Sequence, residues 1–322
     1  MNATFTPYRP QPDFIRVRDM LVETVCAFEQ PVNWRLERWN YARYFVSPML
    51  GTSGVDPDPA GAEAGINRWE RSVGLWEDGA GQIVGLVTKE HAEPSHSSFS
   101  EAFLMRRPGW EHILPEMLAY AETRLANPLG GSFQIYLYDY DHAARQAAQD
   151  RGFAPTDWHG FDSVLKVGKL PRLKLPRGFR LQSMAEANEI DRRRKAFGLG
   201  FNHPDPNDWP SDLAYKELQR APDYRRELDL SIVDAEGEHA AVCIIWMDDY
   251  NKLATLEPVA TIPKYRNLGL GSLVVTAAVR RVAELGATEI HVGSGQPFYI
   301  KLGFQRQFRN DVWSKHLSPR AA

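Results

Sequence analysis

Cysteine is scarce in this chain of 322 residues, which contains only Cys26 and Cys243. Two cysteines so far apart in sequence cannot form the disulfide framework of a small secreted protein, and they are too few for a zinc site. Both stand in apolar stretches, so we expect two buried, reduced thiols. No nearby histidine has the spacing of a metal ligand, and no metal is expected.

A membrane span, a secretion signal and a surplus of positive charge are missing as well. No apolar run approaches the length needed to cross a bilayer, and Met1 to Pro7 lacks the charged-then-apolar pattern of a signal peptide. The formal net charge is −3, so no overall basic field draws the chain to nucleic acid. We expect a cytoplasmic protein without nucleic-acid or membrane partners, present as a monomer or a homodimer.

The chain consists of two similar halves. A basic segment with two prolines, residues 168–177, has neither helical nor strand spacing and is expected to be a linker. On each side of it the same order recurs: two strands, an amphipathic helix, a third strand, and a final strand after Gly-Phe. These elements are expected at residues 81–87, 101–105, 116–126, 132–138 and 154–167, and again at 240–246, 253–261, 269–285, 288–292 and 305–317. In the second half they follow helices at 185–197 and 212–220 and a strand at 227–233.

A turn with two glycines joins the strand at 253–261 to the next helix. Its sequence is Pro263-Lys264-Tyr265-Arg266-Asn267-Leu268-Gly269-Leu270-Gly271. Glycines let the backbone approach a ligand closely, and the open N–H groups of a helix's first turn, with the helix dipole, favour an anion. The pattern indicates a phosphate or pyrophosphate cradle, with an ordinary tight turn as the alternative.

This turn resembles the pyrophosphate loop of the GCN5-related N-acetyltransferases (GNAT family). Arg266, Gly269 and Gly271 fill the three fixed places of the family signature, which is Gln or Arg, two residues, Gly, one residue, then Gly or Ala. Further on, Phe298 to Phe304 resembles the second signature, a Tyr followed by a short helix that ends in Leu-Gly-Phe. The resemblance implies an α/β (α+β) fold of two tandem GNAT-like domains, residues 1–167 and 178–322, each a mixed, mostly antiparallel sheet flanked by helices.

The resemblance also implies roles for individual residues. The acetyl-CoA co-substrate would bind the backbone of Val259, Ala260 and Thr261 through its pantetheine, and the turn residues Arg266, Asn267, Leu268, Gly269, Leu270 and Gly271 through its pyrophosphate. Tyr299 would protonate the departing thiolate, with a packing role as the alternative. The family often has an Asn at the end of the next strand, and here Ser294 or Gln296 could replace it.

The acceptor side is less defined. Glu257 is the only carboxylate in the strand at 253–261, so it is the candidate general base, and a structural ion pair is the alternative. Its parity with Thr255 and Val259 places all three on one face, although Pro258 predicts a bulge that makes this uncertain. His203 and Trp209 in a proline-rich loop and Asp249 in a turn are candidates for binding the acceptor, or else they are simply exposed.

The first half lacks the glycines. Aligning the halves places Arg266 on Glu111, Gly269 on Leu114 and Gly271 on Glu116, so carboxylates and side chains stand where a pyrophosphate would bind. This predicts a degenerate first domain without cofactor, as in tandem members of the family that have one working half. An aromatic stretch from Trp34 to Phe45 is expected in a core or domain interface rather than in a ligand pocket.

The function expected from these features is acetyl transfer from acetyl-CoA to an amine of a small molecule or peptide, directly within a ternary complex. The alternative is an acyl-CoA sensor or scaffold without turnover. An aminoacyl transferase that uses a tRNA- or peptide-linked donor is a third reading. Arg266, Gly269 and Gly271 favour CoA instead, and the lack of a basic surplus disfavours tRNA.

Overall fold

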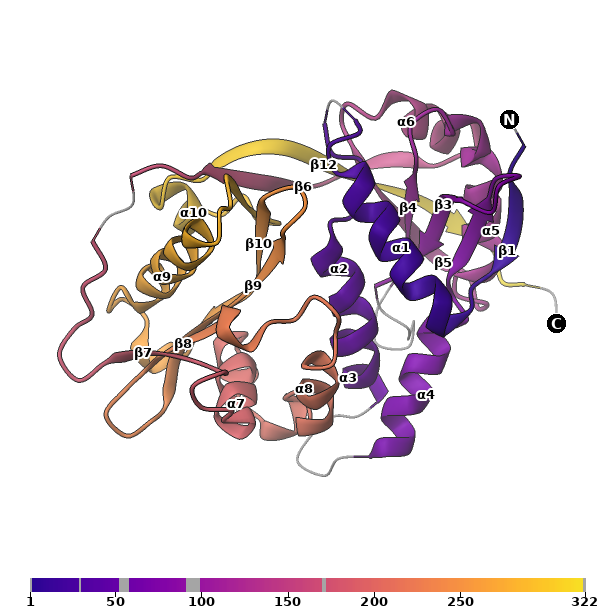
Figure 1. Cartoon of the computed structure of the whole chain (residues 1–322). Helices are drawn as coiled ribbons and strands as arrows, with labels where there is room; N and C mark the ends of the chain where they lie inside the picture. The colour runs from indigo at the N-terminus through magenta and orange to yellow at the C-terminus, as the bar shows by residue number, and fades with distance from the viewer. Residues whose placement is uncertain (1, 29, 52–57, 91–98, 170–171, 321–322) are drawn as a thin grey trace. The chain divides into compact units, whose positions relative to one another are not determined.

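The computed structural model describes residues 2–28, 30–51, 58–90, 99–169 and 172–320, which form two compact units (Figure 1). Unit 1 comprises Met1–Leu50, Ala64–Phe161 and Phe308–Ala322. Unit 2 comprises Gly51–Glu63 and Asp162–Gln307. In the part of the chain that the structure describes, no helix is long and apolar enough to cross a membrane.

Unit 1 is built on a sheet in the order β1-β2-β3-β4-β5-β12, in which only β4 and β5 pair in parallel. Helices α1 and α2 pack on one face of this sheet, and helices α5 and α6 pack on the other, so each face has its own apolar core. The elements that belong to the first half of the sequence are β1 (Thr4–Pro7), α1 (Pro10–Thr24), α2 (Leu36–Tyr41), α3 (Ser47–Gly51), α4 (Pro59–Glu70), β2 (Gly74–Glu77), β3 (Ile83–Thr88), β4 (Phe99–Arg106), α5 (Leu114–Arg124), β5 (Gly131–Tyr138) and α6 (His142–Asp150).

Unit 2 has the sheet order β6-β11-β10-β9-β8-β7, in which only β10 and β11 pair in parallel. The apolar residues of β8, β9, β10 and α9 form its core, and α9 is a helix because its apolar positions recur along one face. The elements are β7 (Arg180–Ser183), α7 (Ile190–Gly200), α8 (Asp212–Leu218), β8 (Asp229–Val233), β9 (His239–Asp248), β10 (Leu253–Thr261), α9 (Leu270–Glu284), β11 (Glu289–Val292) and α10 (Pro297–Lys301).

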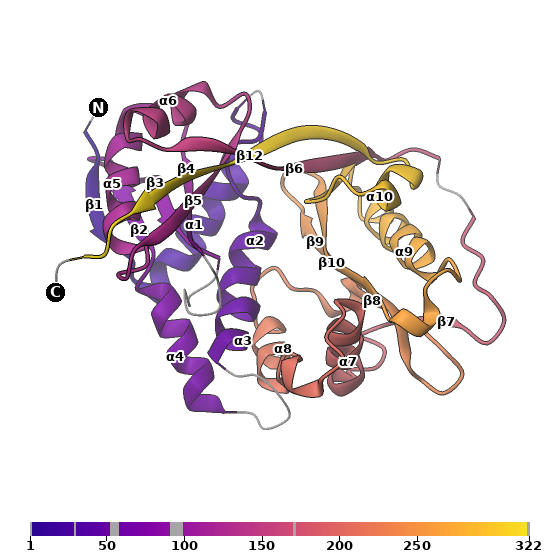
Figure 2. The same cartoon turned by 180° about the vertical axis from the view of Figure 1, so that it is seen from behind.

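Two long strands, β6 (Ala154–Lys166) and β12 (Gln305–Leu317), have residues in both units (Figure 2). Residues 163–166 of β6 pair with β11 in unit 2, although β6 is the last strand of the first half of the sequence. Residues 310–317 of β12 pair with β5 in unit 1. The boundaries of the compact units therefore differ from the predicted domains 1–167 and 178–322, because the end of the last strand of each half belongs to the other unit.

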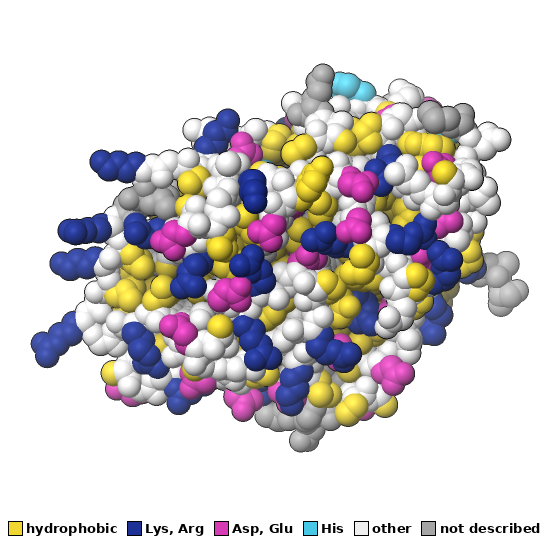
Figure 3. All heavy atoms as spheres, viewed as in Figure 1, with side chains coloured by type: hydrophobic (Ala, Val, Ile, Leu, Met, Phe, Trp, Pro, Cys, Tyr) yellow, Lys and Arg dark blue, Asp and Glu magenta, His cyan; other side chains and the backbone are white. Residues whose placement is uncertain are grey.

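The predicted linker is docked against unit 2 over its described residues. Leu173 and Leu175 pack against the core of unit 2, while Lys169, Arg172 and Lys174 are exposed. From Arg172 to Leu175, exposed basic residues alternate with leucines that contact the core, so this part of the segment has an apolar side and a basic side. In the view of Figure 3, Lys and Arg side chains project along the edge where this segment runs in Figure 1.

The predicted strands and helices that follow the repeat pattern are confirmed, with β10 and β12 at the expected bounds. The helix expected at 185–197 begins only at Ile190. Before it, the Ser183 N–H and hydroxyl donate to the Glu186 carboxylate, and the Glu186 N–H donates to the Ser183 hydroxyl. These bonds form a separate turn, so the helix begins after it. The short strands β1, β2 and β7 were not predicted, because four residues give too little alternation to recognise.

The prediction of two buried thiols is half wrong. Cys243 is buried in β9, but Cys26 is exposed, because it lies in the turn after α1 rather than on the buried face of the helix. The aromatic stretch behaves as expected for a core. Trp39, Tyr41 and Phe45 are buried, and Trp39 stacks on Phe14 at 5.3 Å between ring centroids.

Candidate active site

The candidate site is organised by an edge of β10 that has no strand partner among the described residues over part of its length. β10 pairs with β9 as far as Thr261, but it pairs with β11 only as far as Thr255. In an antiparallel ladder, hydrogen-bonded residues alternate. Because Ile262 N–H donates to Ala240 at 3.0 Å, the backbone of Ala260 faces β9, and that of Val259 and Thr261 faces the open edge. Two of the three residues predicted to bind pantetheine thus present their backbone there.

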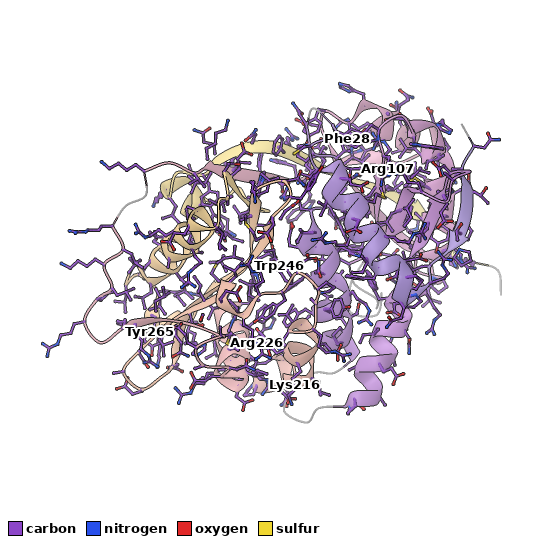
Figure 4. The ribbon with its side chains drawn as sticks, viewed as in Figure 1. Phe28, Arg107, Lys216, Arg226, Trp246 and Tyr265 are labelled. Carbon is purple, nitrogen blue, oxygen red and sulfur yellow. The ribbon has the colours of Figure 1, made fainter. Side chains whose placement is uncertain are left out.

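A β-bulge interrupts β10 at Glu257 and Pro258, as Pro258 predicted. The register with β9 shifts between Leu256 and Val259, so two residues of β10 oppose one of β9. The indole N–H of Trp246 donates to the Glu257 carbonyl at 2.8 Å and so holds the bulge (Figure 4).

The bulge overturns the predicted parity. Because one extra residue is inserted, Leu256 and Val259 share a face, whereas Thr255 and Val259 lie on opposite faces. The facing of Glu257 is therefore set by the bulge that Trp246 holds and does not follow from simple alternation.

Two glycines allow helices to approach β10 closely from both faces. A Cβ on Gly200, the last residue of α7, would lie 2.6 Å from Ala260 Cβ. A Cβ on Gly271, in the first turn of α9, would lie 2.9 Å from Thr261 Oγ1. Since neighbouring side chains on a strand point to opposite faces, α7 and the start of α9 cover opposite faces of β10. A side chain at position 271 would therefore have to displace the side chain of Thr261.

The turn between β10 and α9 is fixed by polar contacts. Tyr265 donates to the carboxylates of Asp234 and Glu238 in the β8–β9 hairpin, and it lies at the edge of unit 2 in Figure 4. Burial acts against the ionised form of Glu238, but hydrogen bonds from Lys195, Lys264 and Tyr265 lower its pKa to about 2. Burial and the bond to Asp234 raise the pKa of Tyr265 to about 12, so it stays a donor.

The side chain of Arg266 is used within the protein. Its Nε donates to the Thr261 carbonyl at 3.2 Å, and its Nη2 donates to the Gly200 carbonyl at 2.8 Å. Arg266 therefore ties the turn to the ends of β10 and α7. This leaves recognition of an anion to the backbone that follows.

That backbone forms the N-terminus of a helix of 15 residues, α9. Asn267 and Gly269 adopt positive φ angles of 67° and 76°, which turn the chain into the helix. Gly269 is the N-cap, and within the described part of the chain no side chain caps it. The first helical bond runs from Leu273 N–H to the Gly269 carbonyl. The N–H groups of the first turn, from Leu270 onwards, are thus available to a ligand, and residues 266–269 are exposed.

Tyr299 lies in α10, next to this helix start. The ring of its neighbour Phe298 comes within 3.5 Å of the Cβ position of Gly271. Tyr299 is buried, and burial, then the fields of Cys243 and Glu257, raise the pKa of its phenol. The structure therefore brings Tyr299 and Glu257 within electrostatic reach of each other, and the phenol is protonated at neutral pH.

The predicted acceptor residues are each engaged locally. Trp209 covers Gly198 of α7, where a Cβ would lie 2.0 Å from its ring, and its indole donates to the His203 carbonyl at 2.9 Å. The side chain of His203 is exposed. Asp249 is exposed and lies 3.6 Å from Arg225. These contacts fix the loop around Trp209, and they leave the roles of all three as predictions.

The corresponding edge in unit 1 is closed by the protein itself. β4 pairs with β5 only as far as Ala102 but continues to Arg106, as β10 continues to Thr261. The buried amide of Asn33 occupies this edge: its Oδ1 accepts from Arg106 N–H at 2.9 Å, and its Nδ2 donates to the Arg106 carbonyl at 2.7 Å. Asn33 thus makes the pair of bonds that an amide ligand would make.

The helix start in unit 1 is also unsuited to an anion. Pro115 occupies the first turn of α5 and has no N–H, and Glu116 places a carboxylate there. The amide of Gly109 donates to Glu111 at 3.2 Å. When α5 and α9 are aligned by their first residues, Gly269 falls on Ile113 and Gly271 on Pro115. This structural alignment differs by one residue from the sequence alignment, which paired the glycines with Leu114 and Glu116. Both glycines are lost in either alignment.

Comparison with known proteins identifies the second half. Residues 195–304 match the model of the acetyltransferase (GNAT) family. This segment lies within unit 2, which is called the GNAT domain below. The match includes the second part of α7, β10, the turn before α9, and Tyr299, and it ends at Phe304. No curated protein matches the sequence.

Solved structures show the same fold over nearly the whole chain. A GCN5-related N-acetyltransferase from Sphaerobacter thermophilus is 14% identical, with a TM-score of 0.55 over 90% of this chain and 96% of its own. A tandem GNAT protein from the clavulanic acid biosynthesis pathway is 13% identical, with a TM-score of 0.55 over 99% of this chain and 100% of its own. A glucosamine N-acetyltransferase region in a fungal multi-domain β-N-acetylglucosaminidase is 14% identical, with a TM-score of 0.55 over 98% of this chain and 38% of its own. They confirm the predicted fold of two tandem GNAT-like domains.

Among the described residues, no group of three or more His, Cys, Asp or Glu side chains could hold a metal ion.

The sequence did not identify Trp246, Tyr265 or Asn33 as site residues. A Trp on the strand opposite a proline bulge is a usable signal for Trp246, whereas Asn33 is too distant in sequence from Arg106 to be found by pattern.

Proposed function

We propose that the GNAT domain transfers an acetyl group from acetyl-CoA to an amine of a small molecule or peptide. One observation supports this most strongly: the open edge of β10 leads directly into the uncapped N-terminus of α9, with Tyr299 beside it. The edge offers the backbone of Val259 and the N–H of Thr261 to the amides of pantetheine, because the Thr261 carbonyl already accepts from Arg266. The first turn of α9 offers N–H groups and a positive dipole end to the pyrophosphate.

We assign the chemistry to two ionisable groups, Glu257 and Tyr299, because the charge of Glu257 acts on the phenol of Tyr299. The amine nitrogen attacks the thioester carbonyl carbon, a C–N bond forms, and the C–S bond breaks. Glu257 accepts the proton that the amine loses, directly or through water, and Tyr299 gives its proton to the departing sulfur. The raised pKa of Tyr299 keeps the phenol protonated until the thiolate develops, and the nearby carboxylate of Glu257 helps to maintain it.

We propose one acetyl-CoA site per chain, in unit 2. In unit 1 the amide of Asn33 occupies the strand edge, and Pro115 and Glu116 remove the anion site at the start of α5. Side chains of the protein thus replace both parts of the cofactor that the second unit is able to bind. This supports a degenerate first domain.

A panel of amines tests the proposal, with release of the CoA thiol as the readout and mass spectrometry of the acetylated product. The panel includes aminoglycosides, polyamines, amino acids and peptides with a free N-terminus. We expect at least one class to give thiol release that depends on the amine, and the Tyr299→Phe variant to be slower with it. Tight acetyl-CoA binding without product from any class would overturn catalysis in favour of a sensor.

A further inference from the structure

The loop from Gly293 to Gln296, which joins β11 to α10, is held by the last strand of each half of the sequence. Ser163 of β6 donates its hydroxyl to the Ser294 carbonyl at 2.7 Å. Arg306 of β12 donates to the Gly295 carbonyl through Nε at 2.8 Å and Nη2 at 2.6 Å. Ser163 is fully buried and Ser294 is half-buried, so this bond lies at the boundary of the core.

This loop sets the position of Tyr299. The Gln296 amide donates to Ser294 Oγ at 3.3 Å, and the Gln296 carbonyl accepts from Tyr299 N–H at 3.0 Å to begin α10. Ser163 is therefore connected to Tyr299 through consecutive bonds of one short loop. A shift of the Ser294 carbonyl moves the start of α10, and the phenol moves with it.

β6 also supports the far end of α10. Leu165 Cδ1 lies 3.4 Å from the Cβ position of Gly303, the residue that turns the chain out of α10 with a φ of 96°. Residues 163–166 pair with β11 along its whole length. The strand from the first half thus contacts both the loop before α10 and the turn after it.

We propose that Ser163 is a positioning residue for Tyr299, so that the first half of the chain contributes to catalysis by supplying β6 to the GNAT domain. This rests on the proposed function, because it takes Tyr299 as the general acid. Ser163 touches no reacting atom in this account. It acts by holding the Ser294 carbonyl and, through it, the phenol.

The test compares two variants of the full chain that each remove one hydroxyl of β6. Ser163→Ala removes the bond to Ser294, and Thr156→Val removes a similar bond, from Thr156 Oγ1 to the Val312 carbonyl at 2.9 Å, in unit 1. We expect Ser163→Ala to lower kcat about fivefold, the usual effect of one lost hydrogen bond, with KM for acetyl-CoA within about twofold. Thr156→Val should leave both constants unchanged at a matched melting temperature.

A double-mutant cycle with Tyr299→Phe separates positioning from general stability. If Ser163 acts through the phenol, Ser163→Ala should cost little once the phenol is gone, so the two losses will not add. Fully additive losses, or equal effects of Ser163→Ala and Thr156→Val, would overturn the proposal. If Tyr299→Phe alone turns over like the wild type, the proposed acid itself fails.

Amide hydrogen exchange gives a readout that needs no acceptor. Ser163→Ala should raise exchange in the segment that contains the loop and α10, residues 293–303, while Thr156→Val should leave it unchanged. Unchanged exchange in this segment would contradict the positioning role even if acetyl transfer is confirmed. Failure of the inference and failure of the proposed function are thereby distinguished.

Discussion

Substitution of Gly271 tests the anion cradle, because side chains can be added there in steps. A Cβ at this position lies 2.9 Å from Thr261 Oγ1 and 3.5 Å from the ring of Phe298. Gly271→Ala therefore requires a shift of a few tenths of an ångström in Thr261, while Ala gains about 0.5–1 kcal/mol over Gly inside a helix. We expect near-wild-type stability and weaker acetyl-CoA binding. Gly271→Gln adds bulk, and Gly271→Glu adds the same bulk with a charge.

The effect of charge follows from the difference between Gln and Glu. A carboxylate about 5 Å from two phosphate charges is repelled by roughly 2–3 kcal/mol at the high permittivity of an exposed turn. Glu should therefore bind acetyl-CoA about 30- to 150-fold more weakly than Gln, and salt should reduce this gap. Calorimetric titration at low and high ionic strength measures both. Equal affinities of Gln and Glu, or wild-type affinity of Gly271→Glu, would refute a pyrophosphate site at the start of α9.

Two further predictions concern single ionisable groups. Tyr299→Phe should keep the affinity for acetyl-CoA but lower turnover about 100-fold. The loss of turnover should be smaller with an acyl donor whose thiol is more acidic. Wild-type turnover at a matched melting temperature would remove Tyr299 from the mechanism. Because the folded pKa of Glu238 is lowered from 4.5 to about 2, its stabilisation is present above pH 4.5 and is lost as the pH falls toward 2. Glu238→Gln should accordingly be less stable than the wild type at pH 7, and the gap should close between pH 4.5 and 2 in denaturant titrations; a gap that is independent of pH would contradict this.

The sequence predicted the parts of the fold that depend on local pattern. The strand at 253–261, the glycine turn and the helix after it follow from alternation, from conformational needs of glycine and from helical periodicity, which are properties of neighbouring residues. The bulge was expected because Pro258 cannot donate in the ladder. The opposite facing of Thr255 and Val259 was missed, because it depends on the register with β9.

Features that depend on residues far apart in sequence could not be predicted. The extension of β6 and β12 into the other unit needs pairings with β11 and β5 that no local pattern specifies. The same is true of the contact between Asn33 and Arg106, which closes the strand edge in unit 1. The loss of glycines in the first half predicted a degenerate domain from one strand-to-helix turn. The structure adds a second, independent support for it at the strand edge.

Calorimetric titration of the full chain with acetyl-CoA tests the central claim most directly. We expect one site in the GNAT domain, at the edge of β10 and the start of α9, and none in unit 1. The stoichiometry should be near one for the wild type, and Gly271→Glu should lose binding. A stoichiometry near two, or binding that survives Gly271→Glu, would contradict it.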